Sequence, residues 1–212
     1  MAKDSLIQQL EQIPAKRQKY VVKTDKIRRD IDSSRKNYEA VYGEIYVEGV
    51  DVDITLAAQD TYYQLVVWSP GSAVNGESNG TSPDITNDHI VIGHTGKYFV
   101  HWHVSAYSGA KNEYELEVFV NNGATGFGNT EAYRTTSTAS AVGLTSGGGI
   151  CTFNTGDTVE LWVERKDGAA VSKTFSVRQA TLSVMKLNTD LSELAAYIST
   201  LTNDLKKQKI LD

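Results

Sequence analysis

Residues 96–105 read GKYFVHWHVS, a run rich in aromatic, β-branched and histidine residues. Such residues favour β-strands, whose side chains alternate between two faces. The face expected in the core carries Tyr98, Val100, Trp102 and Val104. The other face carries Phe99, His101, His103 and Ser105. Whether the two histidines bind a metal, exchange protons or line a surface depends on what that second face meets.

Several further segments have the same strand-like character and together predict the fold class. They are GEIYVEG, VDVDITL, TYYQLVVW, NEYELEVFVNN, GGGICTFN, DTVELWVE and KTFSVRQATLSVMKL. Gly, Asn, Asp and Ser cluster between them, as expected of turns. Strands in this number with no helix between them predict a mainly β protein, an antiparallel sandwich or barrel.

Charge and cysteine content narrow the function classes. The net charge is −5; residues 1–41 carry 10 basic and 6 acidic side chains (+4), and residues 42–185 carry 7 and 16 (−9). An acidic body is a poor match for nucleic acid, whose phosphates need clustered cations. No apolar run reaches the roughly 20 residues of a membrane-spanning helix. The single cysteine, Cys151, lies in an apolar strand and is expected to be a core residue.

The two ends of the chain show helical spacing. Residues 1–41 alternate charged and apolar side chains, with a weak heptad pattern that Pro14 interrupts. Residues 188–212 belong to a stricter heptad pattern, whose seam is Leu187, Leu191, Leu194, Ile198, Leu201 and Leu205. That pattern favours self-association in a short coiled coil, and the alternative is an amphipathic helix packed on its own domain. We therefore divide the chain into a helical arm (1–41), a β body (42–187) and a C-terminal helix (188–212).

Three motifs of the β body resemble the C1q/TNF-type jelly roll. GKYFVHWHV is similar to that family's glycine–X–aromatic–aromatic strand, and SGGGICTFNTGDTVELWV to its hairpin, with Gly156 and Asp157 at the turn. FSVRQATLSVMKL resembles the closing strand, although residues 180–184 depart from the family's Phe-Gly-Phe-type ending. The opening GEIYVEG and the Thr/Ser/Asn-rich loops also resemble jelly-roll modules of tailed-phage virion proteins: head fibres, decoration proteins and tail appendages.

The resemblance implies a homotrimer in which one sheet faces a three-fold axis. It implies that the first and last strands are antiparallel neighbours, so that both helical arms leave the body together. It further implies a non-enzymatic virion structural protein, made in the host cytoplasm and attached to a capsid, portal or tail protein through residues 1–41. The alternative is a receptor- or glycan-binding knob of a phage tail appendage. No cofactor, nucleic acid or membrane insertion is expected.

On this reading the trimer interface contains Phe99, His101 and His103 together with the heptad seam. One chain offers only two imidazoles, whereas zinc normally takes three or four protein ligands. Three copies around an axis could supply the missing ligands, and the alternative is hydrogen-bonded interface histidines without an ion. Histidines packed at an axis would make the trimer weaker near pH 5 than near pH 8.

Two long loops, residues 69–88 and 121–149, are small, polar and glycine-rich. If the protein binds a host surface glycan, the expected contacts are Phe127, Tyr133 and Arg134; the alternative is a simple connector. The acidic pair Glu115 and Glu117 occupies successive outward positions of a strand, and is expected to be solvated rather than catalytic.

Overall fold

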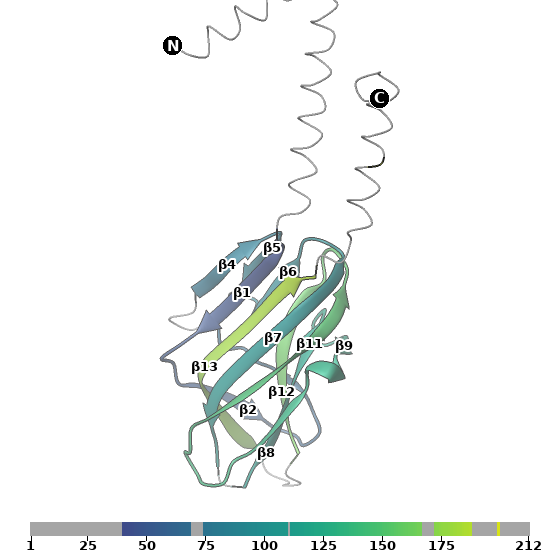
Figure 1. Ribbon diagram of the computed structural model, residues 1–212. Helices are drawn as coiled ribbons and strands as arrows, with labels where there is room; N and C mark the ends of the chain where they lie inside the picture. The colour runs from purple at the N-terminus through teal and green to yellow at the C-terminus, as the bar shows by residue number, and fades with distance from the viewer. Residues whose placement is uncertain (1–39, 69–73, 110, 167–171, 188–198, 200–212) are drawn as a thin grey trace, which may run out of the picture. The chain divides into compact units, whose positions relative to one another are not determined.

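The structure is a computed structural model that describes residues 40–68, 74–109, 111–166, 172–187 and 199 (Figure 1). The expected helical arm (1–41) and C-terminal helix (188–212) lie outside these residues, apart from residues 40, 41 and 199. Among the described residues, no helix has the length and apolar character needed to cross a bilayer.

The described chain is built almost wholly of strands, with one turn of 3-10 helix at Gly128–Thr130. In chain order the strands are β1 (Tyr42–Val47), β2 (Val52–Leu56), β3 (Tyr63–Gln64), β4 (Val74–Asn79), β5 (Thr81–Asp84), β6 (His89–Ile92), β7 (Gly96–Tyr107), β8 (Glu113–Val120), β9 (Thr125–Gly126), β10 (Ala132–Thr135), β11 (Gly143–Phe153), β12 (Thr158–Arg165) and β13 (Lys173–Lys186). Every pairing between them is antiparallel.

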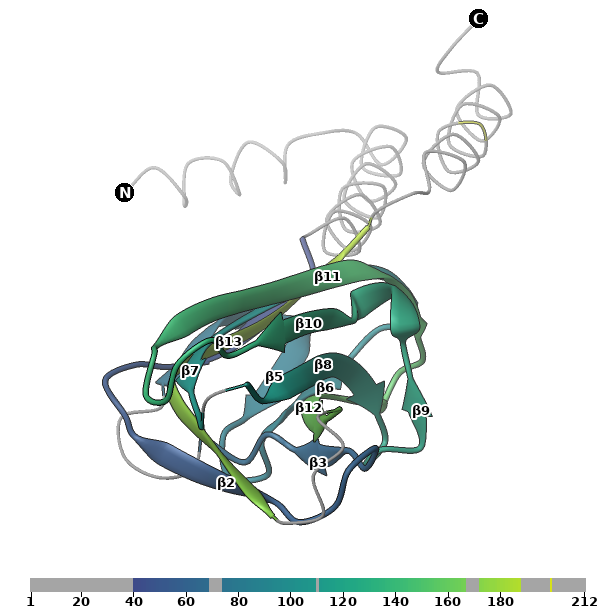
Figure 2. The ribbon, with the colours of Figure 1, turned by 90° about the horizontal axis from the view of Figure 1, so that it is seen from below.

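The strands form two sheets. The six-stranded sheet has the order β11-β7-β13-β1-β4, with β2 also paired to β13. The seven-stranded sheet has the order β10-β8-β12-β6-β5, with β3 paired to β12 and β9 to β8. Seen from below in Figure 2, β11 and β13 lie in one layer and β8 and β12 in the other.

The strand order is that of a jelly roll. One layer contains β1, β13, β7 and β11, and the other contains β6, β12, β8 and β10. When these eight strands are followed in chain order, every connection between successive strands passes from one sheet to the other, except that from β8 to β10. The first and last strands are antiparallel neighbours, as expected from the motifs. Consequently β1 begins and β13 ends at the same end of the body, the upper one in Figure 1.

The core lies between the two sheets and confirms the predicted faces. The inward set of β7 is buried throughout: Tyr98, Val100, Trp102, Val104 and Ala106. The indole Nε1 of Trp102 donates to the carbonyl oxygen of Thr130, 2.9 Å away, so the buried polar atom of this large side chain is satisfied. Cys151 is 2% exposed, and burial raises the pKa of its thiol to about 11, in keeping with a core residue.

The loops hold more strand than their composition predicts. Residues 69–88 include β4 and β5, and residues 121–149 include β9, β10 and the first half of β11. Conversely, TYYQLVVW contributes only the two-residue β3, although Leu65, Val67 and Trp68 are fully buried. A polar segment can still pair its backbone with a free sheet edge, and an apolar segment can be buried without pairing its backbone in a sheet. Composition therefore predicts the strands poorly both in the two loops and in TYYQLVVW.

Candidate assembly interface

The outer face of the six-stranded sheet is ordered in rows, because paired strands hold residues directly opposite one another. The first row is Ile150, Phe99, Met185 and Tyr42. The second row is Gly148, His101, Ser183 and Glu44. The third row is Ser146, His103, Thr181 and Tyr46. We call these three rows the histidine face.

The first row of the histidine face exposes large apolar side chains. Ile150 is 57% exposed, Met185 50% and Phe99 40%. Of the seven large hydrophobic residues exposed in the described part of the chain, these three and Leu144 lie on strands of the six-stranded sheet. An exposed apolar group of this kind is typical of a surface that another protein covers.

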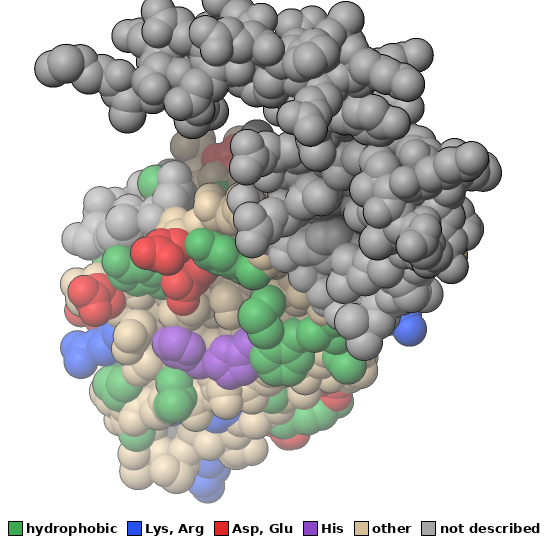
Figure 3. Space-filling model, turned by 45° about the horizontal axis from the view of Figure 1, so that its top comes forward, with side chains coloured by type: hydrophobic (Ala, Val, Ile, Leu, Met, Phe, Trp, Pro, Cys, Tyr) green, Lys and Arg blue, Asp and Glu red, His purple; other side chains and the backbone are tan. Residues whose placement is uncertain are grey.

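The two histidines follow this apolar row along β7, and Figure 3 shows histidine side chains next to hydrophobic ones on the surface. The ring centroids of Phe99 and His101 are 6.4 Å apart with nearly parallel planes, and those of His101 and His103 are 6.2 Å apart. His101 is exposed and His103 half-buried, whereas Trp102 between them is fully buried. The predicted alternation along this strand is therefore confirmed.

The neighbours of the histidines across the sheet are small. Gly148 and Ser183 flank His101, and the Ser183 hydroxyl lies 3.2 Å from the backbone oxygen of His101, to which it donates. Nε2 of His103 lies 3.2 Å from the hydroxyl oxygen of Thr181 on β13. Because these flanking side chains are small, the His101 imidazole is accessible from above the sheet and that of His103 is partly so.

The surroundings of His103 favour its neutral form. Burial, and then the nearby His101, lower the pKa of His103 below its ordinary value of 6.5, while the carboxylate of Glu44 acts in the opposite direction. An open hollow in the same surface is lined by Tyr42, Glu44, Glu77, Phe99, His101 and Met185. The histidine face thus combines an apolar row, two imidazoles and the carboxylate of Glu44, with the carboxylate of Glu77 beside it on β4.

Sequence reasoning found only part of this surface. Phe99, His101 and His103 were expected there, and the structure brings them together with Ile150 and Met185, which were not. Their alternation with the buried Cys151 and Val184 is visible in the sequence, but the register that places them beside Phe99 is not. Leu187 follows β13, its N–H donating to the carbonyl of Lys97 at 2.8 Å. The remaining seam residues lie outside the described residues: Leu191, Leu194, Ile198, Leu201 and Leu205.

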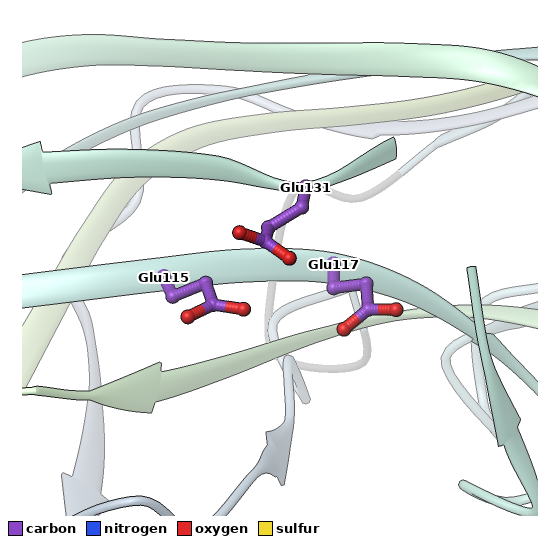
Figure 4. Close-up of side chains that lie close together, drawn as sticks. All are labelled: Glu115, Glu117 and Glu131. Atoms are coloured by element: carbon purple, nitrogen blue, oxygen red, sulfur yellow. The ribbon is translucent and has the colours of Figure 1, made fainter. Parts of the chain in front are cut away.

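The outer face of the seven-stranded sheet carries a carboxylate cluster of Glu115, Glu117 and Glu131 (Figure 4). Glu115 and Glu117 do occupy outward positions, but they are 3% and 8% exposed rather than solvated. The hydroxyl of Tyr62 covers them, 2.5 Å from Oε1 of Glu115 and 2.8 Å from Oε2 of Glu117. The expectation of a solvated pair is therefore wrong, because a loop side chain closes over the strand.

The cluster is balanced by its own partners. Nζ of Lys166 lies 3.1 Å from Oε2 of Glu115 and also pairs with Glu164. Burial raises the pKa of Glu117. Burial acts the same way on Glu115, but hydrogen bonds from Tyr62 and Lys166 outweigh it, so its pKa is lowered. These carboxylates form a buried network with the tyrosine and the lysine, an arrangement that accounts for them structurally.

The three expected receptor contacts differ in accessibility. Phe127 is partly buried, and its ring meets that of Phe153 edge-on with centroids 5.3 Å apart. Arg134 donates to the backbone oxygens of Ala106 and Ala141 at 2.7 and 3.0 Å, and so ties β10 to its surroundings. Tyr133 is 57% exposed. Of the three, Tyr133 alone presents most of its side chain to solvent.

No protein-family model matches the chain, and no curated protein matches it. Among solved structures, Eiger TNF from S. frugiperda is similar over 70% of this chain and 92% of its own, with 10% identity and a TM-score of 0.49. Murine APRIL at pH 5.0 is similar over 70% of this chain and 100% of its own, with 10% identity and a TM-score of 0.45. The globular domain of zebrafish complement 1qA is similar over 70% of this chain and 97% of its own, with 15% identity and a TM-score of 0.44. The jelly-roll assignment rests on the strand order described above.

Proposed function

We propose that the chain assembles as a homotrimer through its histidine face and serves as a non-enzymatic structural protein of a virion, a head fibre or decoration protein. The observation that carries the proposal is the exposed row of Ile150, Phe99 and Met185. Removing apolar surface from water is favourable by about 25 cal/mol per Å², and this gain opposes the entropic cost of association. The motif resemblance to trimeric C1q/TNF-type jelly rolls supports three copies with this sheet toward the axis.

The anchoring role is proposed for the two ends of the chain. Because β1 begins and β13 ends as paired neighbours, residues 1–39 and 188–212 join the body at the same end. The heptad pattern of Leu191, Leu194 and Ile198 would let three C-terminal segments associate there. Residues 1–41, with their excess of basic side chains, would then contact the capsid, portal or tail protein.

A direct test measures the mass of the full-length chain in solution. Light scattering coupled to gel filtration should give about three times the 23.2 kDa of one chain. Phe99→Glu places a carboxylate in the apolar row and should yield monomers, because a charge buried without a partner is costly. Val66→Glu is the matched control, since Val66 is 48% exposed and lies outside the histidine face. A wild-type monomer, or a Phe99→Glu trimer, would contradict the proposal.

The alternative, a receptor- or glycan-binding knob of a tail appendage, is favoured by one observation, the exposure of Tyr133. An exposed aromatic ring can stack on the apolar face of a sugar. Under this alternative Tyr133→Ala, made in the protein that keeps Phe99 and is trimeric, abolishes the adsorption of particles to the host. Under the decoration proposal the same change leaves adsorption at the wild-type level.

A further inference from the structure

The histidine face holds the parts of a ligand site that one chain cannot complete. His101 and His103 leave the same face of β7 with ring centroids 6.2 Å apart. The structure gives the ring nitrogens of His101 no hydrogen-bond partner among the described residues, and the side chain is exposed. A structural zinc site takes four protein ligands and an open site takes three. Two imidazoles of one chain therefore fall short by at least one.

The position of His101 within the face suggests where the missing ligands come from. The exposed apolar residues lie on β11, β7 and β13, so β7 is the middle strand of the patch. If three copies cover this patch symmetrically, as the proposed function holds, residues of β7 lie nearest the three-fold axis. His101 follows Phe99 by one row, and its flanking residues Gly148 and Ser183 leave room for the approach of a second chain.

The surroundings also suit a bound cation. The Thr181 hydroxyl at 3.2 Å from Nε2 of His103 can orient that ring, as second-sphere partners do in metal sites. Glu44 and Glu77 line the hollow beside His101, so two carboxylates per chain lie close to the proposed site.

We propose that the trimer binds a divalent first-row transition-metal ion, such as Zn²⁺, Ni²⁺ or Co²⁺, on its three-fold axis, with one imidazole nitrogen of His101 from each chain as ligands. Imidazole suits these ions, and three such ligands leave a coordination position for water or a further group. His103 forms the adjoining imidazole layer, which positions the His101 ring through their contact. This inference rests on the proposed homotrimer, since the site does not exist in one chain.

The test uses the full-length chain, freed of metal with a chelator and dialysed, then titrated with CoCl₂. Visible absorption reports the geometry of histidine-ligated Co²⁺, and native mass spectrometry counts ions per assembly. We expect one ion per three chains. His101→Gln should lose the absorption bands and the bound ion while the trimer mass is unchanged. His94→Gln is the control, because His94 is exposed and lies outside the histidine face.

The outcomes separate this inference from the function on which it rests. A wild-type trimer that binds no ion, or a His101→Gln trimer that still binds one, overturns the metal site and leaves the trimer intact. A wild-type monomer overturns the proposed function first. If His101→Gln fails to fold, His101→Ala replaces it, and loss of the bound Co²⁺ is again expected. His103→Gln should keep the trimer mass and weaken Co²⁺ binding at least tenfold, because it removes the adjoining imidazole layer. Unchanged affinity in that variant contradicts the proposed role of His103.

Discussion

At the scale of single residues, Glu115 and Glu117 show how one pattern yields two electrostatic environments. Both stand on the outer face of β8 and both bind the Tyr62 hydroxyl. Only Glu115 also meets Lys166, so its pKa is lowered, whereas burial dominates at Glu117 and raises its pKa. Folding therefore favours the charged form of one carboxylate and the neutral form of its neighbour.

This difference predicts opposite effects of the same substitution. Glu117→Gln replaces a carboxylate whose charge burial disfavours, and should raise the melting temperature at pH 8. Glu115→Gln removes a charge that Lys166 stabilises, and should lower it. A change of about 1 kcal/mol corresponds to a shift of about 2–4 °C for a chain of this length. Calorimetry of the two variants checks the prediction, and shifts of the same sign in both would contradict it.

His103 gives a second prediction, for chelator-treated protein. Its pKa is lowered in the folded chain, so that chain binds fewer protons than the unfolded chain at pH values just below 6.5, and covering the ring in a trimer would disfavour its charged form further. The contribution of neutral His103 to the stability of the fold and of the trimer is therefore complete above that range, and it is lost as the pH falls toward 5. The charged or titratable groups that face it are His101 on its own strand and Glu44 on β1, whereas β13 presents Thr181 and β11 presents Ser146.

Sedimentation velocity at pH 5 and pH 8 measures this loss. We expect the trimer to dissociate at a higher protein concentration at pH 5 than at pH 8. His103→Gln, which keeps a hydrogen-bonding group next to Thr181, should flatten the dependence. A wild-type trimer with the same dissociation constant at both pH values would refute the prediction.

At the scale of the elements, β11 depends on its glycines to lie over the core. A Cβ atom at Gly147 would stand 2.5 Å from the carbonyl oxygen of Thr130 and 2.6 Å from the indole of Trp102. That carbonyl accepts the indole N–H of Trp102, so the strand, the 3-10 turn and the core side chain occupy one tightly filled space. Glycine is required here for close approach.

We therefore expect Gly147→Ala to destabilise the fold by about 1–3 kcal/mol, the usual cost of overpacking a core. Thr152→Ala is the matched control, because Thr152 is an exposed residue of the same strand. Urea unfolding followed by tryptophan fluorescence measures both free energies. Equal midpoints for the two variants would show that the contact at Gly147 yields without cost.

The elements also show how far a sequence pattern can lead. Alternation in residues 96–107 predicts the faces of β7 correctly, because burial decides the pattern there. Alternation does not reveal register, so the row of Ile150, Phe99 and Met185 emerges only from the paired strands. Nor does it reveal covering loops: Tyr62 comes from a segment whose own strand is two residues long, yet it buries Glu115 and Glu117. Local composition describes a strand well and its environment poorly.

At the scale of the whole molecule, the position of the chain ends links the fold to the proposed attachment. Val41 is 8% exposed, and its carbonyl accepts the N–H of Lys186 at 2.8 Å. The body therefore includes the last two residues of the arm expected from the sequence. A truncation that tests the arm must end at residue 39, because removing Val41 would expose part of the core.

Deletion of residues 1–39 should leave a folded trimer that no longer associates with particles. This result is expected because the proposal gives the two parts different roles: the histidine face assembles the trimer, and the basic N-terminal segment contacts the virion. Gel filtration with light scattering reports the trimer, and co-sedimentation with purified particles reports attachment. Deletion of residues 200–212 is the companion variant, which removes part of the C-terminal helix expected from the sequence and should retain attachment. Particle binding that survives loss of residues 1–39 would place the anchor elsewhere in the chain.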